Sequence, residues 1–133
     1  MSGERATYLD SSAIVKLAVS EPESRALRTY LRRRKPHVSS ALARTEVARA
    51  LLPAGEAAVR RGHDVLARIQ LVRITDRVLA AAGTLAPPEL RSLDAIHLAT
   101  AQQLGGDLAR VVTYDDRMAA AARHLGWTVA QPS

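Results

Sequence analysis

The sequence predicts an α/β fold, a three-layer α/β/α sandwich whose central parallel sheet has four to five strands. Three observations predict it: strand-like and helical patterns alternate along the chain, the 109–113 segment is rich in apolar residues, and the apolar side chains are mostly small. Such alternation is typical of parallel sheets, because helices join their strands. With 133 residues the chain can bury one core but not two. We therefore expect a single domain over residues 1–133.

The first half of the chain contains two strand candidates, each followed by helical segments. In chain order we expect a strand over 6–10, a helix over 11–18, a helix opened by 20–23 and running to about 34, a strand over 37–39, and a helix from 39 or 40 to about 52. Ser11 and Ser12 can cap the first helix. The segment 20–23 resembles a capping box with a proline near the first turn, and Pro36 ends the second helix.

The second half continues the alternation. We expect a helix from about 56 to 68, a strand over 70–74, a helix starting at 75 or 76, a loop at 87–88, a helix over 95–104, a strand over 109–113, a helix from about 116 to 125, and a strand over 127–130. Gly62 weakens the first of these helices, because glycine disfavours a helix interior. The strand over 109–113 is expected to be buried on both faces.

Acidic residues follow two of the strand candidates. Asp10 closes the first strand, and Asp115 follows the strand over 109–113. In open parallel sheets, ligands bind beyond the carboxyl ends of the strands, where the strand order reverses. Both carboxylates are therefore expected at the edge of the sheet that binds a ligand.

Four acidic residues lie in apolar surroundings where solubility does not require a charge: Asp10, Glu46, Asp94 and Asp115. If their side chains converge, the like charges repel one another unless they are protonated or bridged by a cation. Oxygen ligands together with several waters suit Mg²⁺ or Mn²⁺. Such a cation can polarise a phosphate and activate a water for phosphodiester hydrolysis. We therefore expect a metal-dependent site built from these carboxylates.

Each acid also has a local structural role open to it. Asp94 and Asp116 can stabilise the first turns of helices through the macrodipole, and Asp10 can be an N-cap. Glu46 can pair with an arginine on its own helix. A common site is favoured, because four unrelated local roles are a poor explanation for acids at matching edges of one sheet.

Four segments resemble, in order, the motifs of the PIN-domain nucleases. They are residues 8–13, Glu46 within its helix, residues 93–99 and residues 113–117. More narrowly, the chain resembles a VapC-type toxin of a bacterial type II toxin–antitoxin pair, and the resemblance runs from about Tyr8 to Ala130. One of these motifs alone is weak, but the ordered set is specific, and no motif residue departs from the family pattern.

The resemblance implies a homodimer that cleaves RNA with the help of Mg²⁺ or Mn²⁺ and a metal-activated water, and thereby inhibits translation and growth. It also implies inhibition by a cognate VapB-type antitoxin, whose C-terminal segment lies across the active site. Carried over, Asp10, Glu46, Asp94 and Asp115 are the metal-binding and catalytic acids. Asp116 either helps to position a second cation or caps the following helix, and we favour the cap.

Three further residues adjoin these acids. Ser11 and Thr113 can orient a carboxylate or a water, with capping and strand packing as the alternatives. His97 lies one turn after Asp94 on the same helix face. We expect His97 to pack or to support a neighbouring group rather than act as a general base, since hard cations need no imidazole ligand.

The net charge of +6 favours a polyanionic partner, RNA above all. The densest basic run, Arg32–Lys35, is expected to be a solvated helix end, with RNA-backbone contact as the alternative. Trp127 leads into an apolar strand, so we expect it in the core.

Two other function classes explain part of the pattern. A phosphoryl-transfer site of the haloacid-dehalogenase or receiver type needs a second acid two residues after the first, or a lysine after a late strand. Ser12 occupies the first position, and neither Lys16 nor Lys35 follows a late strand. A non-catalytic RNA-binding or regulatory module explains the basic charge, but it leaves the four acids unexplained.

The chain offers no feature that favours a membrane or secreted location. Its first five residues are polar, and charged and hydroxyl residues interrupt the apolar run that follows, unlike in a signal peptide. No stretch approaches the roughly 20 apolar residues that span a bilayer. The absence of cysteine excludes disulfides and cysteine-bound zinc. We therefore expect a cytoplasmic protein without membrane contact.

Overall fold

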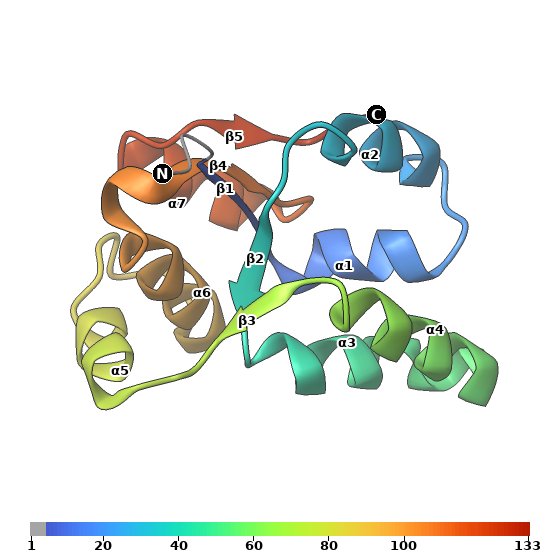
Figure 1. The fold of residues 1–133 in the computed structure, drawn as a ribbon. Coiled ribbons are helices and arrows are strands. Elements are labelled where there is room, and N and C mark those ends of the chain that lie inside the picture. Colours follow the sequence, from blue (N-terminus) through green and yellow to red (C-terminus); the bar gives the residue numbers. More distant parts are fainter. Residues whose placement is uncertain (1–4) are drawn as a thin grey trace.

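Residues 5–133, which the computed structural model describes, form a five-stranded sheet between two groups of helices (Figure 1). The strands are β1 (Ala6–Leu9), β2 (His37–Ser40), β3 (Gln70–Val72), β4 (Leu108–Val112) and β5 (Val129–Ala130). They lie in the order β3-β2-β1-β4-β5, and every neighbouring pair is parallel. The predicted fold class is confirmed.

The helices cover the sheet in two groups that follow each other in sequence. The first group is α1 (Ser11–Ala18), α2 (Ser24–Leu31), α3 (Ala43–Leu51) and α4 (Glu56–Leu66), and the second is α5 (Asp76–Gly83), α6 (Ser92–Gln102) and α7 (Asp116–His124). Short 3-10 turns, η1 (Leu52–Ala54) and η2 (Gly105–Asp107), follow α3 and α6. Figure 1 shows the first group on one side of the sheet and the second group on the other.

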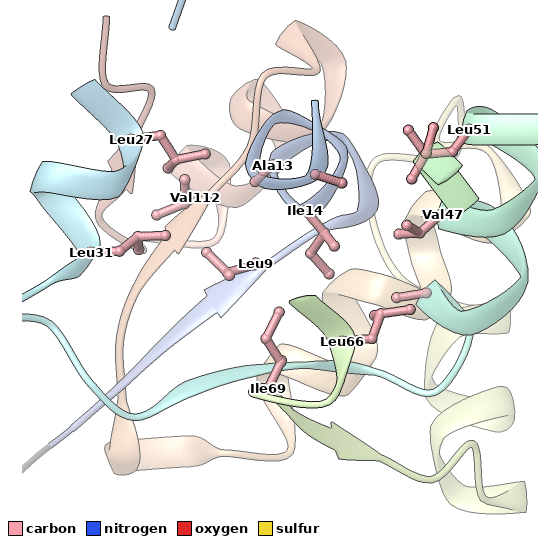
Figure 2. Packing of buried hydrophobic residues seen from close by; sticks show 13 residues of the cluster. Leu9, Ala13, Ile14, Leu27, Leu31, Val47, Leu51, Leu66, Ile69 and Val112 are labelled. Carbon is pink, nitrogen blue, oxygen red and sulfur yellow. The ribbon is translucent and has the colours of Figure 1, made fainter. Parts of the chain in front are cut away.

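Alternation along β1 supplies both cores, because successive strand side chains point to opposite faces. Leu9 packs with Ile14, Val47 and other residues of α1–α4 (Figure 2). Its neighbour Tyr8 points the other way and packs in the core that includes Ala101 of α6. The central strand therefore holds both helix layers in place.

Strand β4 is less buried than expected. Leu108, Val111 and Val112 are buried, but Ala109 and Arg110 are only partly so. The guanidinium of Arg110 donates a 2.6 Å hydrogen bond to Thr7 Oγ1. A charged side chain with a polar partner interrupts the apolar pattern at this point, so the expectation of burial on both faces holds only for the end of the strand.

Two helices begin later than the sequence predicts, in both cases because a serine side chain forms a turn first. Ser24 Oγ accepts from Glu21 N at 2.9 Å, so residues 20–23 precede α2 rather than opening it. At its other end, α2 stops at Leu31 instead of near 34. Strand β2 extends to Ser40, whose Oγ accepts from Leu42 N at 3.0 Å, and α3 starts at Ala43.

Gly62 does not interrupt α4. A Cβ atom at this position would lie 2.6 Å from Leu51 Cδ1 and 3.1 Å from Val47 Cγ1. The missing side chain therefore lets α4 approach α3 closely, a packing reason that outweighs the weak helix preference of glycine.

The topology places a ligand site between β1 and β4. From β1 the chain continues to β2 and β3 on one side, and the later strands β4 and β5 lie on the other side. The strand order thus reverses between β1 and β4, the point where open parallel sheets bind ligands at their carboxyl edge. No helix in the part of the chain that the structure describes is long and apolar enough to cross a membrane.

Candidate active site

The carboxyl edge of β1 and β4 carries the first of the predicted acids. Leu9 and Val112 are paired in the sheet, Asp10 follows β1 directly, and Thr113 and Asp115 follow β4 within three residues. Segments that are a hundred residues apart in the sequence therefore converge at the point where the strand order reverses.

Asp10 is buried, with 3% of its surface exposed, and both of its carboxylate oxygens accept hydrogen bonds. Oδ1 accepts from Ser12 Oγ at 2.7 Å and from Ala13 N at 3.1 Å, and Oδ2 accepts from Thr113 Oγ1 at 2.6 Å. Burial raises the pKa of Asp10, and the hydrogen bonds from Thr113 and Ser12 oppose that rise. The Ala13 bond makes Asp10 the N-cap of α1, which is one of the two roles that the sequence left open.

The same hydroxyl groups connect Asp10 to the loop after β4. Thr113 Oγ1 accepts from Asp115 N at 3.0 Å, and Ser12 Oγ accepts from Tyr114 N at 3.0 Å. Sequence reasoning treated Ser12 only as a cap and missed this contact. A hydroxyl residue two positions after an acid was the only available signal, and it is common in turns.

Asp115, not Asp116, caps α7. Asp115 is partly buried, and its Oδ1 accepts from Arg117 N at 2.9 Å and from Met118 N at 3.1 Å. Asp116 is the first helical residue and is exposed, and its Oδ1 accepts from Gln131 Nε2 at 3.4 Å. The cap assigned to Asp116 is therefore wrong, because the residue with extended backbone immediately before the helix is Asp115.

Glu46 points to the same region from α3. Its Oε1 accepts from Ser11 Oγ and from His97 Nε2, both at 2.6 Å. Burial disfavours the charged carboxylate, but these two hydrogen bonds together hold the pKa of Glu46 below its ordinary value. Its observed partners are thus a serine and a histidine from other elements rather than the arginines of α3, which are exposed.

His97 is buried between Glu46 and Tyr8. Its Nδ1 lies 2.7 Å from the Tyr8 hydroxyl, and its ring packs edge-on against the Tyr8 ring. Burial, followed by the charge of Asp10, raises the pKa of Tyr8 well above its ordinary value, so Tyr8 keeps its proton. Because a carboxylate only accepts, His97 Nε2 carries the proton that Glu46 receives. Tyr8 therefore contacts one ring nitrogen of His97 while Glu46 contacts the other, an arrangement that sequence reasoning missed.

Asp94 lies in the first turn of α6 and is half-buried. Burial is the main cause that raises its pKa, and the charge of Asp115 is the second, while the charge of His97 opposes the rise. The charges of Asp10 and Glu46 raise it further. The charges of the other three predicted acids thus all act on this one carboxyl group.

The donor set is suited to a hard cation but does not form a closed cage. Among residues 5–133, no three His, Asp or Glu side chains lie in an arrangement that could hold a metal ion as it stands. Mg²⁺, however, usually keeps several waters and takes only one or two protein carboxylates. The four acids offer only oxygen ligands; one of them is buried, and another is half-buried and repelled by its neighbours' charges. They fit such a water-rich site.

Two other predicted features lie away from these acids. The run Arg32–Lys35 joins the end of α2 to the start of β2, at the amino edge of the sheet, opposite the acids. Arg34 lies over the Tyr30 ring, 3.8 Å from its centroid, while its neighbours are exposed, as expected for a solvated helix end. Trp127 is partly buried and packs against both clusters on the α6 side of the sheet.

Comparison with known proteins identifies relatives over almost the whole chain. The PIN domain family model matches residues 7–124. Ribonuclease VapC46 of Mycobacterium tuberculosis is 66% identical over 128 residues, which cover 96% of this chain and 98% of that protein. Ribonuclease VapC47 of the same species is 38% identical over 130 residues, covering 94% and 96% of the two chains.

Solved structures share the fold at much lower sequence identity. The crystal structure of M. tuberculosis VapC20, a toxin that cleaves the sarcin-ricin loop, superimposes with a TM-score of 0.74 at 17% identity and covers 95% of this chain and 99% of VapC20. A chain of a toxin–antitoxin complex from Klebsiella pneumoniae gives a TM-score of 0.73 at 20% identity, covering 96% and 98%. At these identities the two structures support the fold alone.

Proposed function

The chain belongs to the PIN-domain family, and within it to the VapC ribonuclease toxins, and from this premise we propose that it is an Mg²⁺- or Mn²⁺-dependent endoribonuclease. The observation that carries the proposal is the convergence of acids at the carboxyl edge of the sheet, where Thr113 bonds Asp10 and the adjacent Ser11 bonds Glu46. The charges of the other acids also raise the pKa of Asp94. Carboxylates that repel one another at the ligand-binding edge of a sheet are stabilised when a divalent cation binds among them.

We assign the cation to Asp10 and Asp94, with Glu46 and Asp115 as further carboxylate ligands, direct or through water. When bound, the cation supplies a Lewis acid that polarises the scissile phosphate and lowers the pKa of a water. The chain's own groups position these acids. Thr113 and Ser12 fix both oxygens of Asp10, and His97 and Ser11 fix one oxygen of Glu46. Groups that orient the ligands of a metal site commonly change affinity or activity by 10–100-fold.

The surface charge supports RNA as the substrate. The chain carries a net charge of +6, which attracts a polyanion over distances comparable to the Debye length. The acids at the sheet edge oppose that attraction locally unless a cation neutralises them. Metal binding and RNA binding at this edge are therefore expected to support each other.

The purified protein tests the proposal with a pool of single-stranded RNA in EDTA, and again after Mg²⁺ or Mn²⁺ is restored. We expect cleavage only with the metal, and a loss of at least about 10²-fold for Asp94→Asn, the scale of removing a group that stabilises transition-state charge. Asp64→Asn is the matched control, because Asp64 is exposed on α4. Cleavage that persists in EDTA, or that Asp94→Asn retains, contradicts the proposal.

Membership of a toxin–antitoxin family also supports a set of cellular roles. We propose that the protein is a cytoplasmic homodimer that arrests translation and growth, and that a cognate VapB-type antitoxin neutralises it. The clustered acids favour an antitoxin segment whose Arg or Lys takes the place of the cation, and the basic surroundings favour acidic residues in the rest of that segment.

Co-expression with the small neighbouring gene tests this partner. We expect a soluble complex without nuclease activity, and light scattering of the purified toxin at the mass of a dimer. A complex that cleaves RNA as fast as the free protein contradicts the inhibition model, and a monomer contradicts the homodimer.

A further inference from the structure

A pocket of about 540 Å³ opens directly beside Asp94. Residues from the loop before α6 form one wall of the pocket, and α7 forms the other. The contribution of α7 is a continuous stripe, since Arg117, Ala120, Ala121 and His124 follow the spacing of one helix face. Asp94 belongs to both this pocket and the candidate active site, so a ligand in the pocket lies next to that site.

The lining combines an apolar helix face with free positive charge. Ala120 and Ala121 provide a flat surface without a side chain beyond Cβ, and Arg91 and Arg117 stand on the two sides of the pocket. Both arginines are exposed, and neither forms an ion pair with any acid in residues 5–133. Glu89 adds one acceptor to the lining. Guanidinium groups bind phosphate through paired hydrogen bonds and also stack on bases.

We propose that this pocket binds the unpaired nucleotide adjacent to the scissile phosphate, with its base over the alanine face and its phosphate between Arg91 and Arg117. The proposal rests on the ribonuclease function proposed above. It adds that the residues of this pocket determine which RNA sequences the enzyme cleaves. Sequence-specific recognition of RNA usually takes unstacked bases into pockets of this kind, where their edges meet polar groups. The volume lies within the range of small-ligand sites, about 300–1,000 Å³.

The lining of the pocket favours a nucleotide over an antitoxin peptide. Its two arginines suit a phosphate, and its alanine face suits the flat surface of a base, so each part of one nucleotide has a partner. The shared Asp94 lets the same RNA strand continue into the site where the phosphodiester is cleaved. The peptide remains as an outcome that the experiment distinguishes.

Three variants of α7 test the proposal. Ala120→Leu fills the pocket from its α7 wall, and Arg117→Ala removes a cation from the same wall. Arg123→Ala is the matched control, because it removes the same charge from the same helix at an exposed position outside the pocket. Thermal melting with and without Mn²⁺ shows whether each variant folds and still responds to the metal.

The first readout is binding of a fluorescent single-stranded RNA of mixed sequence in EDTA, where no metal-dependent cleavage intervenes. We expect Arg117→Ala to weaken binding about tenfold, the scale of a hydrogen bond to a charged group. We expect a change of about twofold at most for Arg123→Ala, because a distant exposed charge is screened. Equal weakening by both arginine variants overturns the proposal, since it shows that only net charge matters.

The second readout is the sequence around the cut sites when a randomised RNA pool is cleaved in Mn²⁺. We expect the wild type to prefer particular bases at one position next to the cut, and Ala120→Leu to lose that preference while cleavage at other sequences continues. An unchanged preference in Ala120→Leu overturns the proposal. If Ala120→Leu or Arg117→Ala weakens antitoxin binding but leaves both RNA readouts unchanged, the pocket binds the antitoxin peptide, and the proposal is wrong. If the wild type cleaves nothing, the ribonuclease proposal fails, and the EDTA binding experiment still decides whether the pocket binds RNA.

Discussion

Thr113 donates a 2.6 Å hydrogen bond to Asp10 across 103 residues of sequence. Both side chains are buried, and the hydroxyl of Thr113 also accepts from Asp115 N. The bond closes the carboxyl edge of the two central strands, so one threonine positions acids that follow β1 and β4. The bond therefore helps to set the geometry of the candidate site.

Replacement of Thr113 by Val keeps the shape of the side chain and removes its hydroxyl. We expect a loss of about 1–3 kcal/mol in the free energy of unfolding, because Asp10 Oδ2 and Asp115 N lose their partner in a buried setting. RNA cleavage should fall about 10–100-fold. Urea unfolding in EDTA and cleavage rates in Mn²⁺ measure the two effects. Thr113→Ser keeps the hydroxyl and should stay close to wild type; equal losses in both variants would show that packing, not the bond, matters.

Replacement of His97 by Gln tests whether His97 only positions Glu46. Gln can still donate to Glu46, so we expect most of the activity to remain. A general base would contribute about 10²–10⁴-fold, and a loss of that size in a folded variant contradicts the assignment. Tyr8→Phe is the companion variant: it removes the hydroxyl that bonds Nδ1 and should cost about 1 kcal/mol of stability with little loss of cleavage rate.

Asp115 is both a helix cap and a candidate metal ligand, and two substitutions separate these roles. Asn also caps helices well, so Asp115→Asn should keep the stability of the metal-free protein, whereas Asp115→Ala should lose about 1 kcal/mol. Both should lose cleavage activity if the negative charge serves the cation. Urea midpoints and cleavage rates give the answer. Full activity in Asp115→Asn would reduce Asp115 to a cap.

Two glycines in helices should respond to alanine with opposite signs. At Gly62 the added Cβ would lie 2.6 Å from Leu51 Cδ1 and 3.1 Å from Val47 Cγ1, and overpacking a buried contact costs about 1–3 kcal/mol. At Gly83 no atom lies within 4 Å of the added Cβ, so Gly83→Ala should stabilise by up to about 1 kcal/mol. Chemical denaturation measures both. A stabilised Gly62→Ala protein would show that α3 and α4 can move apart at no cost.

Local patterns were sufficient to predict the central part of the fold. Strands β1 and β4 carry short apolar runs that end in acids, and parallel topology brings such ends together. The boundaries of α2 and α3 could not be predicted, because they depend on which backbone group the hydroxyls of Ser24 and Ser40 meet. A serine near a helix start is compatible with a cap or with the turn before it.

The partners of the acids were also beyond sequence reasoning. Glu46 and His97 are 51 residues apart. The hydrophobic pattern of a helix cannot predict that one of its side chains contacts a helix on the opposite face of the sheet. The choice between Asp115 and Asp116 as the cap depends on the backbone conformation of one residue. The pocket beside Asp94 was missed as well. It forms where the loop before α6 lies against α7, and the sequence does not show that these two segments are neighbours.

Asp10 and its neighbouring acids are proposed to bind a divalent cation, and thermal melting in EDTA or in Mn²⁺ tests this claim. A ligand at about 100 times its Kd that binds only the native state stabilises it by about 2.7 kcal/mol, which raises the Tm of a domain of this size by roughly 8 °C. We predict such a shift for wild type and for the surface control Asp64→Asn, and a much smaller one for Asp10→Asn and Asp10→Ala. The Mn²⁺-induced change in Tm is measured relative to the same protein in EDTA. It therefore reports metal binding separately from any loss of the N-cap hydrogen bond of α1. Equal Mn²⁺-induced shifts in all four proteins would contradict the claim.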